Sequence, residues 1–305
     1  MTRRTGRCRD ALLVLLLVFA GATGGDAQQT ATSWTASLED GHRVVPNVTY
    51  LTASNCEAKL DLYVARSPDE PRPTIIFIHG GGWVNGVKEG SVTSLLPYLA
   101  MGLNVVNVEY RLARIAQAPA AVEDCRCALR WVIRNAKMYG IDVERLVVTG
   151  QSAGGHLALM TGMLPESAGL DRQCPGTEDL KVAAIVNWYG ITDVNELLEG
   201  AHMKPYAVTW LGSTPDRERI ATRVSPLAYV RPGLPPVFTI HGDADPSVPY
   251  AQAVRLHKAL EEADVPNELM TTPGGRHGYS CCTLDERTAA YQRIRAFLIR
   301  HGVLE

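Results

Sequence analysis

The sequence has almost no excess of charge of either sign. Lysine and arginine together number 30, aspartate and glutamate number 32, and the formal net charge is −2. Proteins that bind nucleic acid through its phosphates carry a clustered basic surface instead. Nucleic acid is therefore not an expected partner.

Long apolar runs are also lacking. The run from Ala11 to Ala20 is about half of the roughly 20 residues needed to cross a bilayer. The sequence therefore predicts no stable membrane span. What the first 27 residues do show is a basic start, this short apolar run and then small residues up to Ala27.

That order is typical of a secretory signal peptide. Cleavage after Ala22 or after Ala27 would leave small residues at the required positions, and Ala27 is our preferred site; a retained anchor is the alternative. We accordingly expect a signal peptide over residues 1–27, a flexible arm over 28–43, and one catalytic domain over 44–305. The expected location is secreted or periplasmic.

The number of cysteines bears on disulfide formation if the protein is exported. Cys8 would leave with the signal, so six cysteines would enter an oxidising compartment, where up to three disulfides can form. Cys125 and Cys127 lie two apart in a helical pattern and should not pair with each other, because such positions face different sides of a helix. Cys281 and Cys282 are adjacent, and we expect them to have different partners.

From residue 74 onward, short apolar β runs alternate with helical stretches. The runs cover residues 75–78, 104–108, 146–149, 182–186, 237–240 and 268–271. Strands that are apolar on both faces and separated by helices indicate a mostly parallel sheet covered on both sides. Residues 44–51 and 59–65 alternate instead and predict an antiparallel N-terminal edge. The fold class is therefore α/β, with helices over residues 121–136 and 285–300, the latter burying Ala289, Ile294, Phe297 and Leu298.

Ser152 lies in the motif Gly150-Gln151-Ser152-Ala153-Gly154, directly after a β run and before a helix-like stretch. A serine on so sharp a strand-to-helix turn projects its hydroxyl away from the backbone, and the flanking glycines avoid clashes there. An ordinary glycine-rich turn is the alternative. The context favours a nucleophile that forms an acyl-enzyme.

His79-Gly80-Gly81-Gly82-Trp83 follows the first central strand. Consecutive glycines present bare N–H groups, which stabilise the alkoxide formed when serine attacks a carbonyl. We assign these donors to Gly81, Gly82 and Ala153, with a plain turn as the alternative. His79 is expected to brace the loop by hydrogen bonding.

The serine needs a base and the base needs an acid. His277 lies in a glycine-rich loop after the last β run and is the preferred base; His156, only four residues from Ser152, is the rival and more typical of a core residue. Asp243 and Asp245 are the candidate acids, and we prefer Asp245.

The spacing of His241, Asp243 and Asp245 also permits a metal site, but no further ligand cluster supports one. The Cys-x-Cys and Cys-Cys spacings do not resemble a structural zinc site either. We therefore predict no metal and no cofactor.

Together these residues resemble the α/β-hydrolase superfamily, in particular its esterase/lipase branch related to hormone-sensitive lipase and to feruloyl or acetyl-xylan carbohydrate esterases. The resemblance covers the chain from about Val44 onward. It is carried by His79–Trp83, Glu109–Leu112, Ala121–Trp131, Gly150–Gly155, Trp188–Asp193 and His241–Pro249. In that family the aspartate before x-x-Val-Pro is the acid, which here is Asp245.

The resemblance implies a serine carboxylesterase acting on a small-molecule or carbohydrate ester, with short-chain acyl or feruloyl and acetyl carbohydrate esters favoured. With the predicted signal peptide, the expected protein is a secreted serine carboxylesterase. Arg114 and Ile115 replace the Pro-Glu of the hormone-sensitive lipase group, and the segment before the first strand is too short for that group's helical cap. Both departures favour the carbohydrate-esterase-like members. Residues 190–235 form the largest insertion and are expected to wall the pocket, with Trp83 and Tyr189 as substrate-binding candidates or as plain core residues.

Two other functions remain open. A serine peptidase of the prolyl-oligopeptidase type shares the serine turn and the order of the three catalytic groups, but it normally has a propeller domain, and the glycine loop after His79 favours esters. A non-catalytic binding protein on a hydrolase scaffold would typically lack one of the three groups. The acyl length, the alcohol and the oligomeric state are not predicted.

Overall fold

The computed structural model describes residues 33, 35–66 and 70–305. The predicted signal peptide lies outside the described residues, as does most of the predicted arm. The arm prediction is wrong at its end: residues 35–41 are helical, and the first strand begins at His42. Ala36, Leu38 and Glu39 are good helix formers, which explains the difference. By contacts the chain divides into two units, Met1–Glu39 and Asp40–Glu305, and the second contains the whole sheet.

In the described part of the chain, eight strands form one sheet in the order β1-β2-β4-β3-β5-β6-β7-β8. β1, β2 and β4 pair antiparallel in that order, and every other neighbouring pair is parallel. The strands are β1 (His42–Ala53), β2 (Cys56–Ala65), β3 (Arg72–Ile78), β4 (Asn104–Val108), β5 (Ile141–Gln151), β6 (Ala184–Trp188), β7 (Val237–Gly242) and β8 (Asn267–Thr272). The predicted parallel sheet with an antiparallel N-terminal edge is confirmed.

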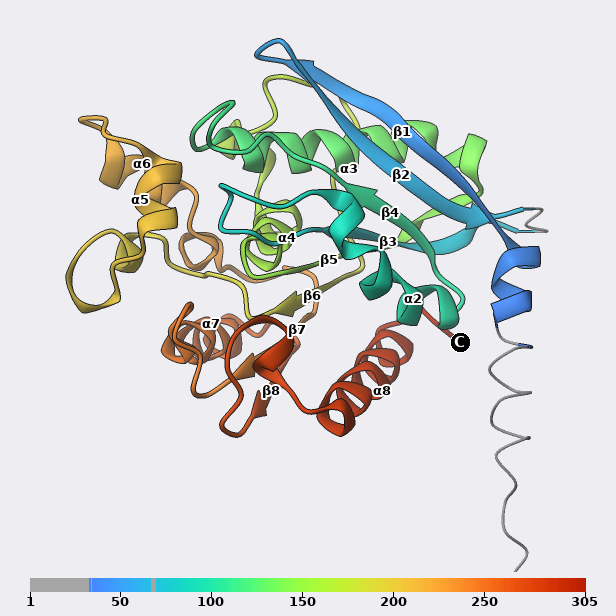
Figure 1. The fold of residues 1–305 in the computed structure, drawn as a ribbon. Coiled ribbons are helices and arrows are strands. Elements are labelled where there is room, and N and C mark those ends of the chain that lie inside the picture. Colours follow the sequence, from blue (N-terminus) through green and yellow to red (C-terminus); the bar gives the residue numbers. More distant parts are fainter. Residues whose placement is uncertain (1–32, 34, 67–69) are drawn as a thin grey trace, which may run out of the picture. The chain divides into compact units, whose positions relative to one another are not determined.

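Helices cover both faces of this sheet (Figure 1). The helices are α2 (Val92–Ala100), α3 (Ala120–Tyr139), α4 (Ala153–Met163), α5 (Pro205–Leu211), α6 (Arg217–Arg223), α7 (Tyr250–Glu262) and α8 (Leu284–Arg300). Alternate residues of β3 show the two sides. Ile76 and Ile78 belong to the core shared with α3 and α4, whereas the ring of Phe77 lies 6.3 Å from that of Tyr98 on α2. Both sides of the strand are buried, as the unbroken apolar run predicts.

Helix α8 packs on the same face as α2, since the rings of Tyr98 and Tyr291 lie 5.7 Å apart. Its buried residues are Ala290, Ile294, Phe297 and Leu298. The expectation that Ala289 is part of this face is wrong by one position. Ala290 keeps the spacing of four and seven residues to Ile294 and Phe297 that one side of a helix requires.

The insertion over residues 190–235 contains α5 and α6, which Figure 1 shows together at one end of the sheet. It is tied to the loop after β7 by two hydrogen bonds: Lys204 Nζ donates to the carbonyl of Pro246 at 2.8 Å and Tyr206 Oη donates to that of Ser247 at 2.9 Å. Trp210 of α5 is fully buried, and its carbonyl accepts a hydrogen bond of 3.0 Å from the N–H of Ala118, in the chain before α3. The insertion is thus packed against the loop after β7 and the chain before α3.

The cysteines pair differently from the prediction in one respect. The sulfur atoms of Cys127 and Cys174 lie 1.98 Å apart, and Cys125 is buried and free, so Cys125 and Cys127 do not pair with each other, as predicted. Cys281 and Cys282, however, are paired with each other rather than with different partners. Among the described residues, Cys56 on β2 and Cys125 on α3 are the free cysteines.

A buried ion pair joins the loop after β4 to α3. Arg111 Nη2 lies 2.6 Å from Asp124 Oδ1, and the two side chains are 4% and 0% exposed. Arg111 N also donates to Asp124 Oδ2 at 2.8 Å. The pair therefore holds the start of α3 against the backbone that follows β4.

Replacing Asp124 by alanine should lower the free energy of unfolding by about 3–5 kcal/mol, because the buried guanidinium of Arg111 loses its counter-charge. Chemical denaturation of the purified proteins measures the change. Asp216→Ala, which breaks an exposed pair with Arg219, is the matched control and should give no resolvable change. Equal losses in both variants would contradict the assignment.

Candidate active site

Ser152 occupies the turn between β5 and α4 in a backbone conformation that few residues adopt. Its φ is +57° and its ψ is −120°. The N–H of Ser152 donates to the carbonyl of Trp188 at the end of β6 at 2.9 Å, which holds the turn against the neighbouring strand. The strained turn is the geometry that the sequence motif predicts.

The two glycines of the motif are required by close packing of backbone against backbone. A Cβ on Gly154 would lie 2.0 Å from the carbonyl oxygen of Ile78, and one on Gly150 would lie 2.5 Å from the same atom. Any side chain at either position would push α4 away from the end of β3. The glycines thus allow the turn to be this tight.

His277 is brought to Ser152 from the loop that follows β8. Its Nε2 lies 2.8 Å from Ser152 Oγ, and its Nδ1 lies 2.6 Å from Asp245 Oδ2. A carboxylate can only accept, so Nδ1 carries the proton and donates it to Asp245. In the neutral ring Nε2 is then the acceptor for the Ser152 hydroxyl, which is the arrangement a general base needs.

Asp245 is surrounded by donors. The N–H groups of Ser247 and Val248 donate to its Oδ1 at 2.7 and 3.0 Å, and His241 Nε2 lies 3.3 Å from its Oδ2. Burial by itself raises the pKa of this carboxyl. The hydrogen bonds from His241 and His277, the charge of His277 and the N–H of Val248 outweigh burial, so the pKa of Asp245 lies well below its ordinary value. The group is therefore ionised at neutral pH.

Asp243, the other candidate acid, has a different position. Its Oδ1 accepts a hydrogen bond of 2.6 Å from the N–H of Gly274, at the start of the loop that carries His277. Asp243 thus contacts the loop and not the imidazole. The structure brings Asp245, and not Asp243, to His277.

Gly81 and Gly82 line the cleft beside Ser152 with backbone conformations that favour glycine. Their φ values are +117° and +61°, and a Cβ on Gly81 would lie 2.0 Å from the carbonyl oxygen of Asn85. Within the described residues neither N–H donates to another protein group. Ala153 is buried directly behind Ser152 as the first residue of α4, where an N–H has no partner inside its helix. Three donors are thus free for a ligand.

Two buried histidines hold this glycine loop in place. His79 Nδ1 donates to the carbonyl of Gly80 at 2.7 Å, and its ring stacks on Tyr110 at 4.3 Å, which agrees with the bracing role predicted for it. His156 Nε2 donates to the carbonyl of Val224 at 2.6 Å, and its Nδ1 accepts from Trp83 Nε1 at 3.1 Å. His156 is therefore a core residue and not the base. Burial lowers the pKa of both histidines to about 4.

Trp83 does not line the cleft, so its prediction as a substrate-binding residue is wrong. Its side chain is 0% exposed and stacks on Trp210 of α5 at 4.1 Å between ring centroids. The positive φ of +60° at Trp83 turns the side chain away from the neighbouring glycines and into the core, where the hydrogen bond to His156 satisfies its N–H.

The cleft at Ser152 has a volume of about 430 Å³. Tyr189, the other predicted binding residue, does line it, and its ring lies 4.9 Å from that of His277. The cleft is completed by residues that sequence reasoning missed: Gly80, Val84, Asn85, Gln151, Tyr206, Ser247 and Gly278. Gln151 could have been found as the residue directly before the serine in the motif. Tyr206 carries no sequence signal, because only packing places the insertion beside the cleft.

Metal ligands do not gather here. In residues 33, 35–66 and 70–305 no group of three or more histidine, cysteine, aspartate or glutamate side chains could hold a metal ion. The same described residues contain no helix long and apolar enough to span a membrane.

Comparison with known proteins agrees with this geometry. A family model, BD-FAE, matches residues 60–260. Esterase LipQ of Mycobacterium tuberculosis is 28% identical over 240 residues, which cover 76% of this chain and 56% of LipQ. The chain thus spans about half of the length of the curated relatives it matches.

Two similar solved structures are matched over nearly their full length. A truncated carbohydrate esterase from gut microbiota has a TM-score of 0.72 and 26% identity, covering 86% of this chain and 98% of that one. The esterase Est2 of Thermogutta terrifontis, bound to propionate, has a TM-score of 0.71 and 26% identity, covering 87% and 96%. The eight-stranded sheet, the turn at Ser152 and the similar solved structures together define an α/β-hydrolase of the esterase branch. Within that superfamily the chain belongs to the BD-FAE family.

The buried histidines predict how stability depends on pH. In the unfolded chain a histidine titrates near 6.5, so below that pH the unfolded state binds protons that the folded state, with pKa values of about 4 at His79 and His156, does not. The free energy of unfolding should therefore fall as the pH drops from about 6.5 to about 4.

His156→Gln should remove about 1 kcal/mol of this fall between pH 6 and pH 5, because glutamine can still donate to Val224 but does not titrate. Urea denaturation at pH 7, 6 and 5 measures the slope. His202→Gln, at an exposed position, is the control and should leave the slope closer to that of the parent protein. An unchanged slope in His156→Gln would contradict the burial of a neutral ring.

Proposed function

We propose that this protein is a serine carboxylesterase that hydrolyses carboxylic esters through an acyl-enzyme. One observation carries the proposal: Ser152 Oγ, the His277 ring and Asp245 form an unbroken hydrogen-bonded series of 2.8 and 2.6 Å. This series ends in a cleft lined by Gly81 and Gly82, whose N–H groups have no partner among the residues that the structure describes. The relatives and neighbours that are named esterases support the proposal.

Acylation begins when Ser152 Oγ attacks the carbonyl carbon of the ester. His277 Nε2 takes the hydroxyl proton as the C–O bond forms, and the imidazolium that results is stabilised by the ionised Asp245. The negative charge that develops on the carbonyl oxygen is bound by the N–H groups of Gly81, Gly82 and Ala153. His277 then returns its proton to the alcohol oxygen, the ester C–O bond breaks, and the acyl group remains on Ser152.

Deacylation repeats these steps with water as the nucleophile. His277 Nε2 takes a proton from water as its oxygen attacks the acyl carbon, and the same N–H groups bind the second oxyanion. Collapse of this intermediate breaks the bond to Ser152 Oγ, which recovers its proton from His277. The carboxylic acid leaves, and no cofactor takes part in the cycle.

The cleft supports a short acyl group or a polar alcohol. It is open, its volume is about 430 Å³, and its lining includes the aromatic residues Tyr189 and Tyr206 and the polar residues Gln151, Asn85 and Ser247. Aromatic walls combined with amide and hydroxyl groups suit an ester of a carbohydrate as well as a simple alkyl ester. The similar solved structures include a carbohydrate esterase and an esterase with bound propionate. Carbohydrate esters and short-chain acyl esters are the two substrate classes that we favour.

We further propose that the protein is exported and that its cysteines form disulfides in an oxidising compartment. The order of basic, apolar and small residues over 1–27 supports export. The pairing of Cys127 on α3 with Cys174, which lie 47 residues apart in the sequence, supports the oxidised state.

Export should be visible in the N-terminus and in the disulfide state of the purified protein. After expression with its first 27 residues in a secreting host, the N-terminus should follow Ala22 or Ala27, and peptide mapping without reductant should find Cys127 linked to Cys174. N-terminal sequencing and mass spectrometry measure both. A product that keeps residues 11–20 and has only free thiols would show that export is wrong, whatever its activity.

The catalytic assignment is tested by hydrolysis of p-nitrophenyl acetate. Ser152→Ala should lower kcat by at least about 10⁴-fold and abolish labelling by a fluorophosphonate, because the nucleophile is gone. Asp245→Asn should lower kcat by about 10³- to 10⁴-fold, because the imidazole loses its charged partner.

Asp243→Asn is the matched control, since this side chain contacts only the loop that carries His277. It should lower kcat by less than about tenfold, the effect of weakening one hydrogen bond. Persistent turnover by Ser152→Ala, or equal losses in the two aspartate variants, would refute the assignment. Absence of both turnover and labelling in the parent protein would favour a binding protein on a hydrolase scaffold.

A further inference from the structure

Four lysine or arginine side chains are buried in the described part of the chain, and three of them lie against a carboxylate. The charged atoms are 2.9 Å apart for Lys88 and Asp61, 2.6 Å apart for Arg111 and Asp124, and 2.5 Å apart for Arg130 and Asp171. The fourth, Arg126 on α3, is 2% exposed and forms no ion pair with any residue that the structure describes. A buried charge without a counter-charge is costly, so Arg126 is an exception that a bound anion would explain.

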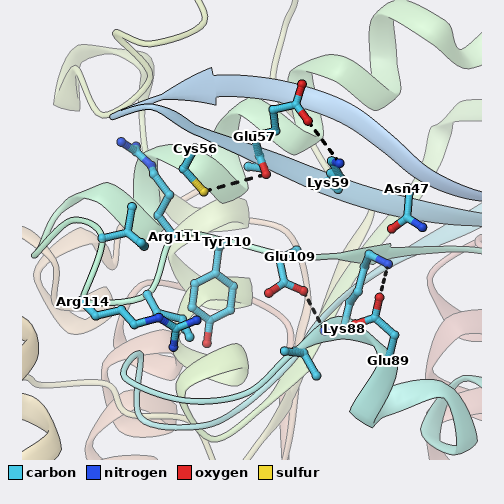
Figure 2. Close-up of a pocket in the computed structure, with 14 residues that line it drawn as sticks. Asn47, Cys56, Glu57, Lys59, Lys88, Glu89, Glu109, Tyr110, Arg111 and Arg114 are labelled. Carbon is cyan, nitrogen blue, oxygen red and sulfur yellow. Dashed lines mark hydrogen bonds and ion pairs between the residues drawn. The ribbon is translucent and has the colours of Figure 1, made fainter.

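The cavity drawn in Figure 2 follows the usual pattern of local pairing. It has a volume of about 390 Å³ and is lined by residues of the β1–β2 hairpin together with residues after β4. Figure 2 shows Lys59 beside Glu57 and Lys88 beside Glu89, and the charged atoms of these pairs are 3.1 and 2.5 Å apart. The buried cations of this wall have little remaining attraction for a ligand, because their charges are neutralised within the protein.

Only one of the three guanidinium nitrogens of Arg126 is used. Its Nη1 donates to the carbonyl of Thr161 at 2.9 Å and to that of Leu180 at 3.5 Å. Nε and Nη2 donate to no described residue, yet neither is a fully buried unpaired atom, so both keep accessible surface. Two parallel N–H groups on the Nε–Nη2 edge of a guanidinium match the two oxygens of a carboxylate. Burial lowers the pKa of Arg126 to about 10, so the group still carries its charge at neutral pH.

Arg126 lines a cavity of about 340 Å³, the Arg126 cavity, at the amino ends of two neighbouring strands. Its lining includes residues 179–183, directly before β6, residues 233–236, directly before β7, and the end of α4. Ser152 follows the carboxyl end of β5, which belongs to the same parallel set as β6 and β7. The Arg126 cavity therefore lies at the opposite end of these strands from Ser152. Helix α4, which has 11 residues and is about 16 Å long, runs from one to the other.

The charged residues of the lining leave the Arg126 cavity with an excess of one positive charge. Arg231 also lines the cavity, is exposed, and forms no ion pair with a residue that the structure describes. Lys181 and Asp179 neutralise each other at 2.5 Å. Glu166 is the remaining charged residue, and its exposure means that solvent screens its carboxylate. The two arginines thus outweigh it.

The carbonyl groups at the end of α4 would by themselves repel an anion, because the carboxyl end of a helix is negative. Three of the last four carbonyls already accept a hydrogen bond, that of Met160 from Leu164 N, that of Thr161 from Arg126 and that of Met163 from Arg231. Since each arginine uses only Nη1 for these bonds, its other nitrogens stay available to a ligand.

Two backbone donors and several apolar side chains complete the lining. Val182 and Leu234 are buried there, and the N–H of neither donates to another described residue. Buried N–H groups without a partner are rare, and a carboxylate oxygen accepts from such groups. Leu164, Pro235 and Pro236 add apolar surface. The volume falls in the range of small-molecule sites, and the mixture of cation, donors and apolar surface suits a ligand with a carboxylate and a hydrocarbon part.

We propose that the Arg126 cavity binds a small organic carboxylate. The Nε–Nη2 edge of Arg126 is the main anchor, and Arg231 is the second cation. The bound carboxylate supplies the counter-charge that Arg126 lacks and joins the end of α4 to the chain before β6 and β7. The site shares no residue with the catalytic cleft, so it goes beyond the proposed esterase reaction and takes no part in it.

Calorimetric titration with sodium benzoate at constant ionic strength tests the site, with benzamide as the neutral analogue. The parent protein should bind benzoate and not benzamide, because the arginines attract only the charged ligand. Arg126→Gln and Arg231→Gln should each raise the Kd for benzoate about tenfold, the effect of losing one charged hydrogen-bonding group. Arg231 is exposed, so this variant keeps the test valid even where Arg126→Gln does not fold.

Arg295→Gln, at an exposed arginine of α8, is the matched control and should bind benzoate as the parent protein does. Any benzoate held in the catalytic cleft is common to all these proteins, so the difference between them reports the Arg126 cavity. No binding of benzoate, equal binding of benzamide, equal Kd values in Arg231→Gln and Arg295→Gln, or tighter binding of inorganic phosphate than of benzoate would overturn the proposal.

Hydrolysis of p-nitrophenyl acetate separates this site from the proposed function. Arg231→Gln should leave kcat within about twofold of the parent value, because the Arg126 cavity lies at the other end of α4 from Ser152. A tenfold loss of kcat would show that the cavity belongs to the catalytic machinery and overturn its independence. A parent protein that binds benzoate through Arg231 but hydrolyses no ester would keep this site and refute only the esterase.

Discussion

The position of the whole site depends on a direct contact between the first turn of α4 and the end of β3. Gly150 and Gly154 both approach the carbonyl oxygen of Ile78 so closely that a Cβ on either would overlap it. Bare backbone packed on bare backbone leaves the turn no room to relax, and Ser152 is held at a φ of +57°. Because β3 continues directly into the glycine loop after His79, the same contact also sets the distance between the nucleophile and the N–H groups of that loop.

The acid and the base are positioned by backbone hydrogen bonds between two loops. Asp243 Oδ1 accepts from Gly274 N, Ala244 N donates to the carbonyl of Gly275, and Thr272 Oγ1 donates to that of Cys281. The first two bonds join the loop after β7 to the loop after β8, and the third ties the loop after β8 back to the end of its own strand. Asp245 and His277 are therefore presented as one unit, and the insertion adds to it through Tyr206 and Ser247. Catalytic geometry in this protein follows from how neighbouring loops of a parallel sheet bind each other.

Some parts of this arrangement could be predicted from the sequence because they depend on local pattern. The unbroken apolar runs predicted the parallel strands, and β4 was predicted to the residue because charge and turn residues bound it on both sides. The prediction that Trp83 binds substrate is wrong, because the sequence does not show whether an aromatic side chain beside a glycine loop points outward or into the core. The prediction that Ala289 lies on the buried face of α8 is wrong by one position, because Ala289 and Ala290 are adjacent and identical in type.

The sequence by itself determined where the parallel strands lie, because buried parallel strands need apolar residues on both faces. It also determined the tight turn at Ser152, because such a turn needs glycine. The order of Ser152, Asp245 and His277 along the chain was likewise readable from the sequence. Only the tertiary structure decided which aromatic side chains line the cleft, which cysteines pair and that residues of the β1–β2 hairpin line a second cavity together with residues after β4. The physical reason is that these features join segments far apart in the chain, such as Tyr206 with Ser247 or Val87 with Ile115. No local pattern records the distance between such segments before the core is packed.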